Sequence, residues 1–333
     1  MVDTHLIILL KGESLFVSNK LRVLSLFSGI GAFEEALDNK GVNYELINYC
    51  EFQDYIANAY SIIRGVDISK NLGDITQVDE HDLDDFDLMT YGFPCQDISA
   101  LGDQKGCFDD EGNLTRSGLF FEAMRIAKFK KPKYMIAENV KALVSKKMAN
   151  NYNLMIETLD SIGYNTYVKV LNSKDFNIPH SRNRVFMVSI RKDIDDGSFE
   201  FPTSVPLSIT AKDLYQSGDI PEEFYLEEKQ YKYFNDFRLK KKYSSLNSEI
   251  LICMTTKQGQ KSNPQNFIKD NKGYRILTDS ELFAFQGFKR EYGELLRSKG
   301  FTTSQIGYMC GNSITVTVLE AIFEQLIPSY INK

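Results

Sequence analysis

The turn Ser28-Gly29-Ile30-Gly31 has the composition of a ligand-binding loop. Glycines between a strand and a helix let the backbone approach a ligand closely. Glu34 stands where a GxGxxG fingerprint has its third glycine, which weakens a dinucleotide interpretation. Glu51 lies 20 residues after Gly31, where a carboxylate binds ribose hydroxyls. S-adenosylmethionine has a ribose and no diphosphate, so it fits both observations; the alternative is a tight turn without a ligand.

A cysteine follows the next buried segment, in Gly92-Phe93-Pro94-Cys95-Gln96. Open α/β sheets place their sites at the carboxyl ends of strands, where Cys95 is expected. Only the thiolate is a good nucleophile, so helix-terminal amides or an arginine would have to lower its pKa from about 8.5. The alternative is a small buried hydrophobic residue.

Further charged groups lie at the ends of other predicted strands: Asp74 and Glu138 where a strand ends, and Arg182 and Arg184 where one begins. Asp74 could accept a hydrogen bond from an adenine amino group, or could be a turn aspartate. Glu138 could act as an acid or donate a hydrogen bond to a ring nitrogen; the alternative is a capping or ion-paired glutamate. Arg182 and Arg184 are two positions apart, so on a strand they face the same way and could point at one anionic site. The alternative is a pair of surface arginines.

Alternating elements must position these groups. Short apolar runs alternate with segments of helical spacing, which predicts a mostly parallel, Rossmann-like sheet with helices on both faces. The predicted strands are 21–27, 44–50, 86–91, 134–137, 166–171 and 184–190, and the predicted helices are 33–39, 52–64, 117–129, 152–162 and 311–326.

The character of the sequence changes near Arg191. Residues 193–272 are polar, charged and aromatic with weak periodicity, and the apolar segment 311–326 needs a partner surface. We therefore expect one domain from residues 20–190 with 311–333, and a smaller domain from residues 191–310.

The composition excludes several classes of protein. Hydrophobic residues make up 43% of the 333 residues, as in ordinary soluble proteins. Five widely spaced cysteines without a CxxC pair argue against a disulfide framework or a zinc ribbon. The early apolar run is too short for a membrane span and lacks a signal peptide's basic flank. We expect a cytoplasmic protein with no membrane partner and no metal.

The net charge of −6 hides a basic region. Residues 229–272 hold ten lysines and arginines against three acidic residues, interleaved with tyrosines and phenylalanines. That mixture suits a polyanion with exposed bases. The alternative is a solvated lysine face.

The order of these motifs resembles the cytosine-C5 DNA methyltransferase family over about residues 20–190 and 273–330. Six motifs follow one another as in that family: Phe27-x-Gly29-x-Gly31, Glu51, Pro94-Cys95-Gln96, Glu138-Asn139-Val140, Arg182-x-Arg184 and Gly311-Asn312-Ser313. Four intermediate segments also agree with the family's pattern: Gly102-x-Gln104-x-Gly106, Arg116–Phe121, Arg275-x-Leu277-Thr278 and Gln286-Gly287-Phe288. His180 departs from the pattern, because the family usually has glutamine there.

The resemblance implies the S-adenosylmethionine-dependent methyltransferase fold, a DNA target-recognition role for the smaller domain of residues 191–310, and a role for each matching residue. Cys95 would attack C6 of a flipped cytosine, Glu138 would hold N3, and Arg182 and Arg184 would orient the base. S-adenosylmethionine would leave as S-adenosylhomocysteine. Its predicted contacts are Phe27, Gly29, Ile30, Gly31, Glu51, Phe52, Asp74, Ile75, Pro94, Leu119 and Asn312. The predicted DNA contacts are Gln96, Ser99, Lys240, Lys241, Lys242, Thr255 and Thr256.

The sequence therefore favours a sequence-specific DNA methyltransferase of a bacterial or phage modification system. We expect a monomer whose partner is double-stranded DNA, with any cognate restriction endonuclease acting separately. A tRNA cytosine methyltransferase is disfavoured because the variable region lacks a Cys-Phe-Thr element. A non-catalytic DNA-binding relative is disfavoured because Cys95, Glu138 and both arginines are present.

Overall fold

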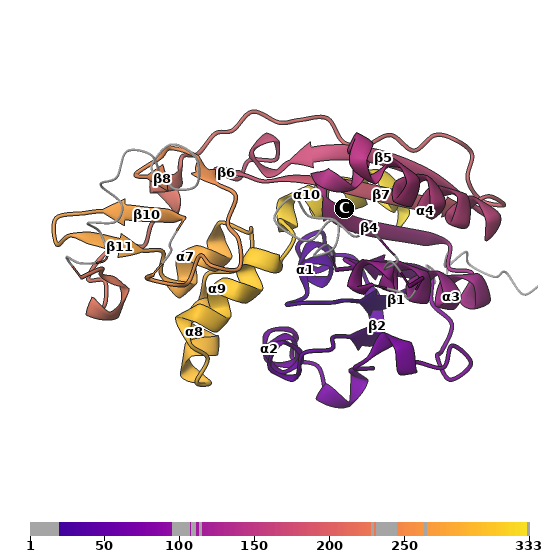
Figure 1. The fold of residues 1–333 in the computed structure, drawn as a ribbon, viewed down its shortest axis with the longest axis horizontal. Coiled ribbons are helices and arrows are strands. Elements are labelled where there is room, and N and C mark those ends of the chain that lie inside the picture. The colour runs from indigo at the N-terminus through magenta and orange to yellow at the C-terminus, as the bar shows by residue number, and fades with distance from the viewer. Residues whose placement is uncertain are drawn as a thin grey trace, which may run out of the picture.

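A central sheet with helices on both faces dominates the computed structural model of the chain (Figure 1). The structure describes residues 20–94, 107, 111–112, 115–227, 230, 245–262 and 265–331. Six of the described strands form this sheet in the order β2-β1-β3-β4-β7-β5. Their bounds are Leu21–Leu26 (β1), Tyr44–Cys50 (β2), Leu88–Tyr91 (β3), Tyr134–Val140 (β4), Tyr164–Asn172 (β5) and Asn183–Arg191 (β7).

The direction of β7 is important for the site. β2, β1, β3 and β4 are parallel to one another, whereas β7 is antiparallel to both of its neighbours, β4 and β5. The prediction of a mostly parallel α/β sheet is confirmed. Because β7 runs in the opposite direction, its first residues lie at the edge where β1, β3 and β4 end.

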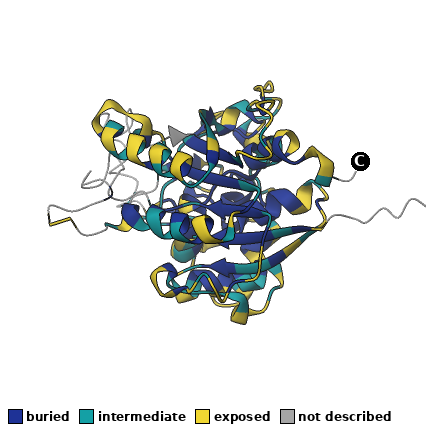
Figure 2. Ribbon diagram, turned by 90° about the vertical axis from the view of Figure 1, so that its right-hand side faces the viewer, coloured by how far each residue is buried: buried dark blue, intermediate teal, exposed yellow. Residues whose placement is uncertain are grey.

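Each face of the sheet packs into its own apolar core. Leu21 and Val23 of β1 belong to one core, with α1 (Ala32–Asn39), α2 (Asp54–Arg64) and α10 (Val316–Leu326). Leu24 and Leu26 belong to the other, with α3 (Phe120–Lys130) and α4 (Ala149–Ser161). Figure 2 shows the buried strands between helices whose outer surfaces are exposed. Alternation of apolar side chains along β1 therefore anchors both helical layers.

A smaller group of elements lies beside the central sheet (Figure 1). β8 (Ser245–Leu246), β10 (Asn266–Lys269) and β11 (Tyr274–Ile276) form a sheet in the order β11-β10-β8, and β6 (His180–Ser181) pairs with β9 (Leu251–Ile252). The helices are α7 (Asp279–Ala284), α8 (Glu291–Ser298) and α9 (Thr303–Asn312). Phe283 of α7 and Ile306 of α9 share an apolar core with α1 and α10. The boundary at residues 190 and 191 stays a prediction.

The predicted helix 311–326 is wrong at its start. α9 ends at Asn312, Ser313 is extended, and α10 begins only at Val316. Gln286 explains the break, because its carbonyl accepts the Val316 N–H at 2.9 Å and its Oε1 accepts the Thr315 hydroxyl at 3.0 Å. These contacts hold the segment between the helices extended, which places Asn312 and Ser313 beside the sheet edge.

The stretch Thr303–Leu326 is long and apolar enough to cross a membrane by length and composition. However, 72% of its apolar window is buried inside the protein. The stretch contains α9 and α10, whose apolar residues belong to the core described above.

Candidate active site

A cavity of about 740 Å³ opens at the carboxyl edge of the central sheet. Its walls come from the segments after β1, β2 and β3, from β4, from the start of β7 and from the end of α9. The predicted catalytic and cofactor residues that line it are Phe27, Gly29, Glu51, Phe52, Asp74, Ile75, Pro94, Leu119, Glu138, Arg182, Arg184 and Asn312. The fold therefore collects residues from distant parts of the chain around one space.

Two backbone amides fix the Glu51 carboxylate at one end of the cavity. The Gly29 N–H donates to Oε2 at 3.1 Å, and the Gln53 N–H donates to Oε1 at 3.0 Å. Asn71 holds the Glu51 backbone, accepting its N–H and donating to its carbonyl. Burial raises the pKa of Glu51, and the two amides offset part of that rise. Each carboxylate oxygen keeps acceptor capacity for a hydroxyl.

Aromatic faces and a second carboxylate stand near Glu51. The Phe52 side chain is 73% exposed although it lines the cavity, so its ring is free to cover a ligand. Phe27 has a φ of +54°, a strained conformation for a residue with a side chain. Asp74 accepts both the N–H and the hydroxyl of Thr76 at Oδ1. Its Oδ2 has no hydrogen-bond donor among the described residues.

Ile30 and Gly31 do not line the cavity. The Ile30 side chain is 1% exposed and belongs to the core around α1. Gly31 has a φ of +80° and precedes α1, and a Cβ there would lie 2.8 Å from the Arg64 Cδ and 3.1 Å from the Tyr60 ring. The structure therefore shows a packing role for both residues, in which glycine allows α1 to approach α2.

A buried ion pair occupies the other end of the cavity. In the antiparallel register of β4 and β7, Val140 faces Arg184 and Glu138 faces Phe186, so Glu138 and Arg184 are diagonal neighbours. Arg184 Nε lies 2.9 Å from Glu138 Oε1. Burial raises the pKa of Glu138, and Arg184 and Arg182 offset part of that rise. This carboxyl therefore holds a proton more readily than an exposed glutamate.

Arg182 lines the same cavity, but its guanidinium makes other contacts. It lies between β6 and β7 and is 3% exposed. Nη1 donates to the Met254 carbonyl at 2.9 Å, and Nη2 donates to the Ser313 carbonyl at 2.7 Å. The two arginines thus share the cavity, while Arg184 pairs with Glu138 and Arg182 joins two backbone segments.

Cys95, Gln96 and Ser99 lie outside the described residues, as do Lys240, Lys241 and Lys242. The residues just before Cys95 are held firmly. Asn139 donates to the Phe93 carbonyl at 3.1 Å, and the Ser117 hydroxyl donates to the Pro94 carbonyl at 2.9 Å.

Thr255 and Thr256 lie next to α9 and do not line the cavity. The Thr255 N–H and hydroxyl both donate to Gln265 Oε1 at 2.8 Å. A Cβ on Gly311 would lie 2.3 Å from the Thr255 carbonyl, so this loop rests directly on the helix.

Comparison with known proteins decides the family. The model of the C-5 cytosine-specific DNA methylase family matches residues 21–328. The chain belongs to this family.

Relatives of this methylase agree over most of its length. It is 30% identical to the orphan methyltransferase M.SPRI of Bacillus phage SPR, over 94% of this chain and 99% of that protein. It is 31% identical to the type II methyltransferase M.Bsp6I of Bacillus sp. (strain RFL6), over 93% of this chain and 99% of that protein. It is 36% identical to the type II methyltransferase M.HhaI of Haemophilus parahaemolyticus, over 63% of this chain and 61% of that protein.

A solved structure shows the same fold. The S. pombe Dnmt2 methyltransferase aligns with a TM-score of 0.73 at 21% identity, over 93% of this chain and 99% of that one. The Entamoeba histolytica methyltransferase EhMeth aligns with a TM-score of 0.73 at 18% identity. At these identities the likeness concerns the fold alone.

Membership in the methylase family implies S-adenosylmethionine as the cofactor, and the cavity residues fit that molecule. Its ribose and adenine carry hydroxyl and amino donors, which match the carboxylate acceptors of Glu51 and Asp74 in the cavity wall. Its flat adenine ring matches the exposed face of Phe52.

Sequence reasoning missed three residues that position this methylase site. Asn139 and Ser117 were part of recognised motifs but had no assigned role, although both hold the segment before Cys95. Asn71, which fixes Glu51, has no signal in the sequence because its contacts depend on the fold.

One described group could offer ligands to a metal ion. Asp79, Glu80 and His81 have ligand atoms within 4.8 Å of one another. Glu80 pairs with Arg125, and His81 Nδ1 lies 2.7 Å from Asp79 Oδ1, so these ligand atoms already have partners within the protein.

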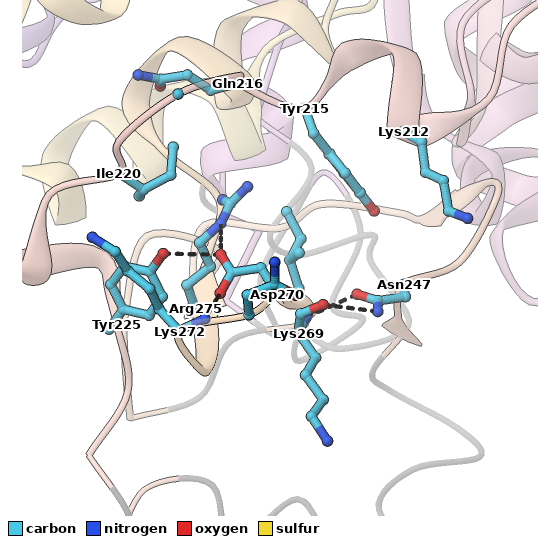
Figure 3. Close-up of a pocket in the computed structure, with 13 residues that line it drawn as sticks. Lys212, Tyr215, Gln216, Ile220, Tyr225, Asn247, Lys269, Asp270, Lys272 and Arg275 are labelled. Carbon is cyan, nitrogen blue, oxygen red and sulfur yellow. Dashed lines mark hydrogen bonds and ion pairs between the residues drawn. The ribbon is translucent and has the colours of Figure 1, made fainter.

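A second cavity of about 410 Å³ lies among the smaller elements of the methylase (Figure 3). Asp270 lies at its centre and accepts from the Tyr225 hydroxyl and from the backbone N–H groups of Lys272 and Gly273, besides pairing with Arg275. Neighbouring donors thus satisfy the central Asp270 carboxylate.

Proposed function

We propose that this methylase flips one cytosine out of duplex DNA at a short specific sequence and transfers a methyl group to its C5. The observation that carries the proposal is the shared cavity. At one end the Glu138–Arg184 pair can hold a pyrimidine, and at the other Glu51 and Asp74 can hold an adenosine. A target base cannot reach such an enclosed edge from inside a duplex, so it must leave the helix.

Cys95 is the proposed nucleophile. Its thiolate attacks C6 of the cytosine and forms a carbon–sulfur bond, which places negative charge on C5. S-adenosylmethionine supplies the methyl group that C5 takes. Loss of the C5 proton then restores the ring's double bond and releases Cys95. The hydrogen bonds on Phe93 and Pro94 support this role, because they fix the chain just before the cysteine.

Glu138 and Arg184 support the attack electrostatically. The raised pKa of Glu138 suits a carboxyl that gives a hydrogen bond or a proton to N3, which draws electron density from C6. Arg184, 2.9 Å from that carboxyl, aligns it. Removing one positioned donor of this kind in other enzymes costs about 10²–10³ in rate.

The biological role we propose is protection of DNA in a restriction–modification system. Two of the relatives that carry this proposal are named type II methyltransferases, M.Bsp6I and M.HhaI. We place the enzyme in the cytoplasm, as a monomer on DNA, with any endonuclease acting separately.

Trapping on 5-fluorocytosine tests the chemistry. Fluorine replaces the C5 hydrogen, so after methyl transfer no proton can leave and the enzyme stays attached. We expect a cofactor-dependent covalent complex with a fluorocytosine duplex that survives denaturing electrophoresis. The Cys95→Ala variant should form none. A wild-type enzyme that methylates the normal duplex but is never trapped would contradict the covalent route.

A tRNA substrate is the alternative. Cys253-Met254-Thr255 matches Cys-Phe-Thr at two of three positions, and Arg182 Nη1 lies 3.6 Å from Cys253 Sγ. The family model is that of a DNA methylase, and the relatives are named orphan or type II methyltransferases, which favours DNA. Transfer of labelled methyl groups to purified tRNA but not to duplex DNA would reverse that preference.

A further inference from the structure

His180 bridges two segments that lie far apart in the sequence. It is 0% exposed in β6. Its Nε2 accepts the Met254 N–H at 2.9 Å, and its Nδ1 lies 3.2 Å from the Phe285 carbonyl oxygen. Since an amide must donate and a carbonyl must accept, the ring is neutral and carries its proton on Nδ1. Burial lowers the pKa of His180, and Arg182 and Arg184 lower it further, which keeps the ring in this form.

His180 and Arg182 together hold both polar backbone groups of Met254. His180 takes the N–H, and Arg182, two positions later, donates to the carbonyl at 2.9 Å. The parallel pairing of β6 with β9, through His180 and Leu251, brings the segments together. Arg182 also donates to the Ser313 carbonyl at 2.7 Å, in the wall of the cavity. One residue, Met254, is therefore tied to the catalytic edge from two sides.

Met254 directly precedes the two threonines predicted to contact DNA. Gln265 Oε1 accepts both donors of Thr255 at 2.8 Å. The Thr255 backbone rests on Gly311 of α9, with no room for a Cβ between them. The short segment 254–256 is thus fixed by His180 and Arg182, by Gln265 and by the helix that ends at the cofactor cavity.

We propose that His180 is a positioning residue for DNA: it holds the segment 254–256 at the distance from the flipped base at which its threonines contact the substrate. This inference rests on the proposed function. Glutamine offers the same pair of groups, a carbonyl that accepts the Met254 N–H and an amide that donates to Phe285. Leucine fills a similar volume but offers neither, and leaves two buried backbone groups unpaired.

The test compares His180→Gln with His180→Leu in steady-state methylation of a cognate duplex, with KM for DNA and KM for S-adenosylmethionine measured separately. We expect His180→Gln to stay within about threefold of wild type in both constants. His180→Leu should raise KM for DNA by about tenfold or more, the equivalent of about 1.4 kcal/mol, and KM for the cofactor by less than about twofold. His81→Leu is the matched control, because His81 is exposed and its contacts are with Asp79 and Phe129.

Gln265→Leu provides a second variant if His180→Leu does not fold, because Gln265 is half-buried and holds the same segment. It should also raise KM for DNA selectively. The inference would be overturned if a folded His180→Leu variant had an unchanged KM for DNA. If only Gln265→Leu folds, an unchanged KM for DNA in that variant would overturn it. So would equal rises in both KM values, or a His180→Gln variant as impaired as His180→Leu. A wild type inactive on every duplex would instead overturn the proposed function, and this inference with it.

Discussion

Replacing Glu51 with alanine should weaken cofactor binding by an amount that the structure lets us bound. The carboxylate already accepts the N–H groups of Gly29 and Gln53, and its remaining lone pairs face the cavity. Losing hydrogen bonds from ribose hydroxyls to a charged, partly buried acceptor costs about 1–3 kcal/mol. The dissociation constant for S-adenosylmethionine should therefore rise by about 5- to 150-fold. Glu51→Gln keeps one oxygen acceptor and should fall between wild type and Glu51→Ala.

Isothermal titration calorimetry measures this constant directly. Thermal unfolding of the unliganded variants must accompany it, because Glu51→Ala also leaves two amides without their acceptor. Glu45→Ala is the matched control, since Glu45 lies on the same strand, β2, with an exposed side chain. An unchanged dissociation constant in a folded Glu51→Ala protein would refute the reasoning and leave Glu51 with a structural role only.

Three other substitutions test the remaining parts of the account. Cys95→Ser should abolish methyl transfer, yet leave cofactor affinity measured by calorimetry nearly unchanged; any retained turnover would remove Cys95 from the mechanism. Glu138→Gln removes a carboxyl whose pKa burial raises, so the folded wild type binds more protons than the unfolded chain between the ordinary and the raised pKa. The wild-type free energy of unfolding should thus fall as pH rises through that window, and urea titrations should show a smaller fall in the variant; parallel curves would contradict the raised pKa. Changing Lys240–Lys242 to alanine should weaken binding equally on cognate and non-cognate duplexes and flatten the salt dependence by at most about 0.9 per lost phosphate contact. If affinity and salt slope both stay unchanged, those lysines form a solvated face.

Local patterns in the sequence were enough to predict the central sheet. The predicted strand 44–50 has the same bounds in the structure, because it is rich in residues that favour strands, such as Tyr44, Ile47 and Tyr49. The position of Glu51 at a strand end followed from the same pattern. Ion-pair partners were harder to predict from the sequence. The Glu138–Arg184 contact depends on β7 running antiparallel to β4, which no local pattern shows.

Contacts between distant segments account for the other differences. The break between α9 and α10 depends on Gln286, which lies outside both helices. His180 looked like a simple departure from the family motif, and its bridging role appears only when Met254 and Phe285 are placed around it. Ile30 and Gly31 belong to the turn that was predicted to bind the cofactor, yet in the structure both residues have a packing role.

Base-resolution reading of genomic DNA tests the central claim most directly. DNA from cells that express the wild-type chain would be compared, by bisulfite or nanopore sequencing, with DNA from cells that express Cys95→Ser. We predict 5-methylcytosine at one position of a single short sequence throughout the wild-type genome, and none at that position with the variant. A wild-type genome without new 5-methylcytosine, from cells in which the protein is folded and abundant, would contradict the assignment of DNA as the substrate.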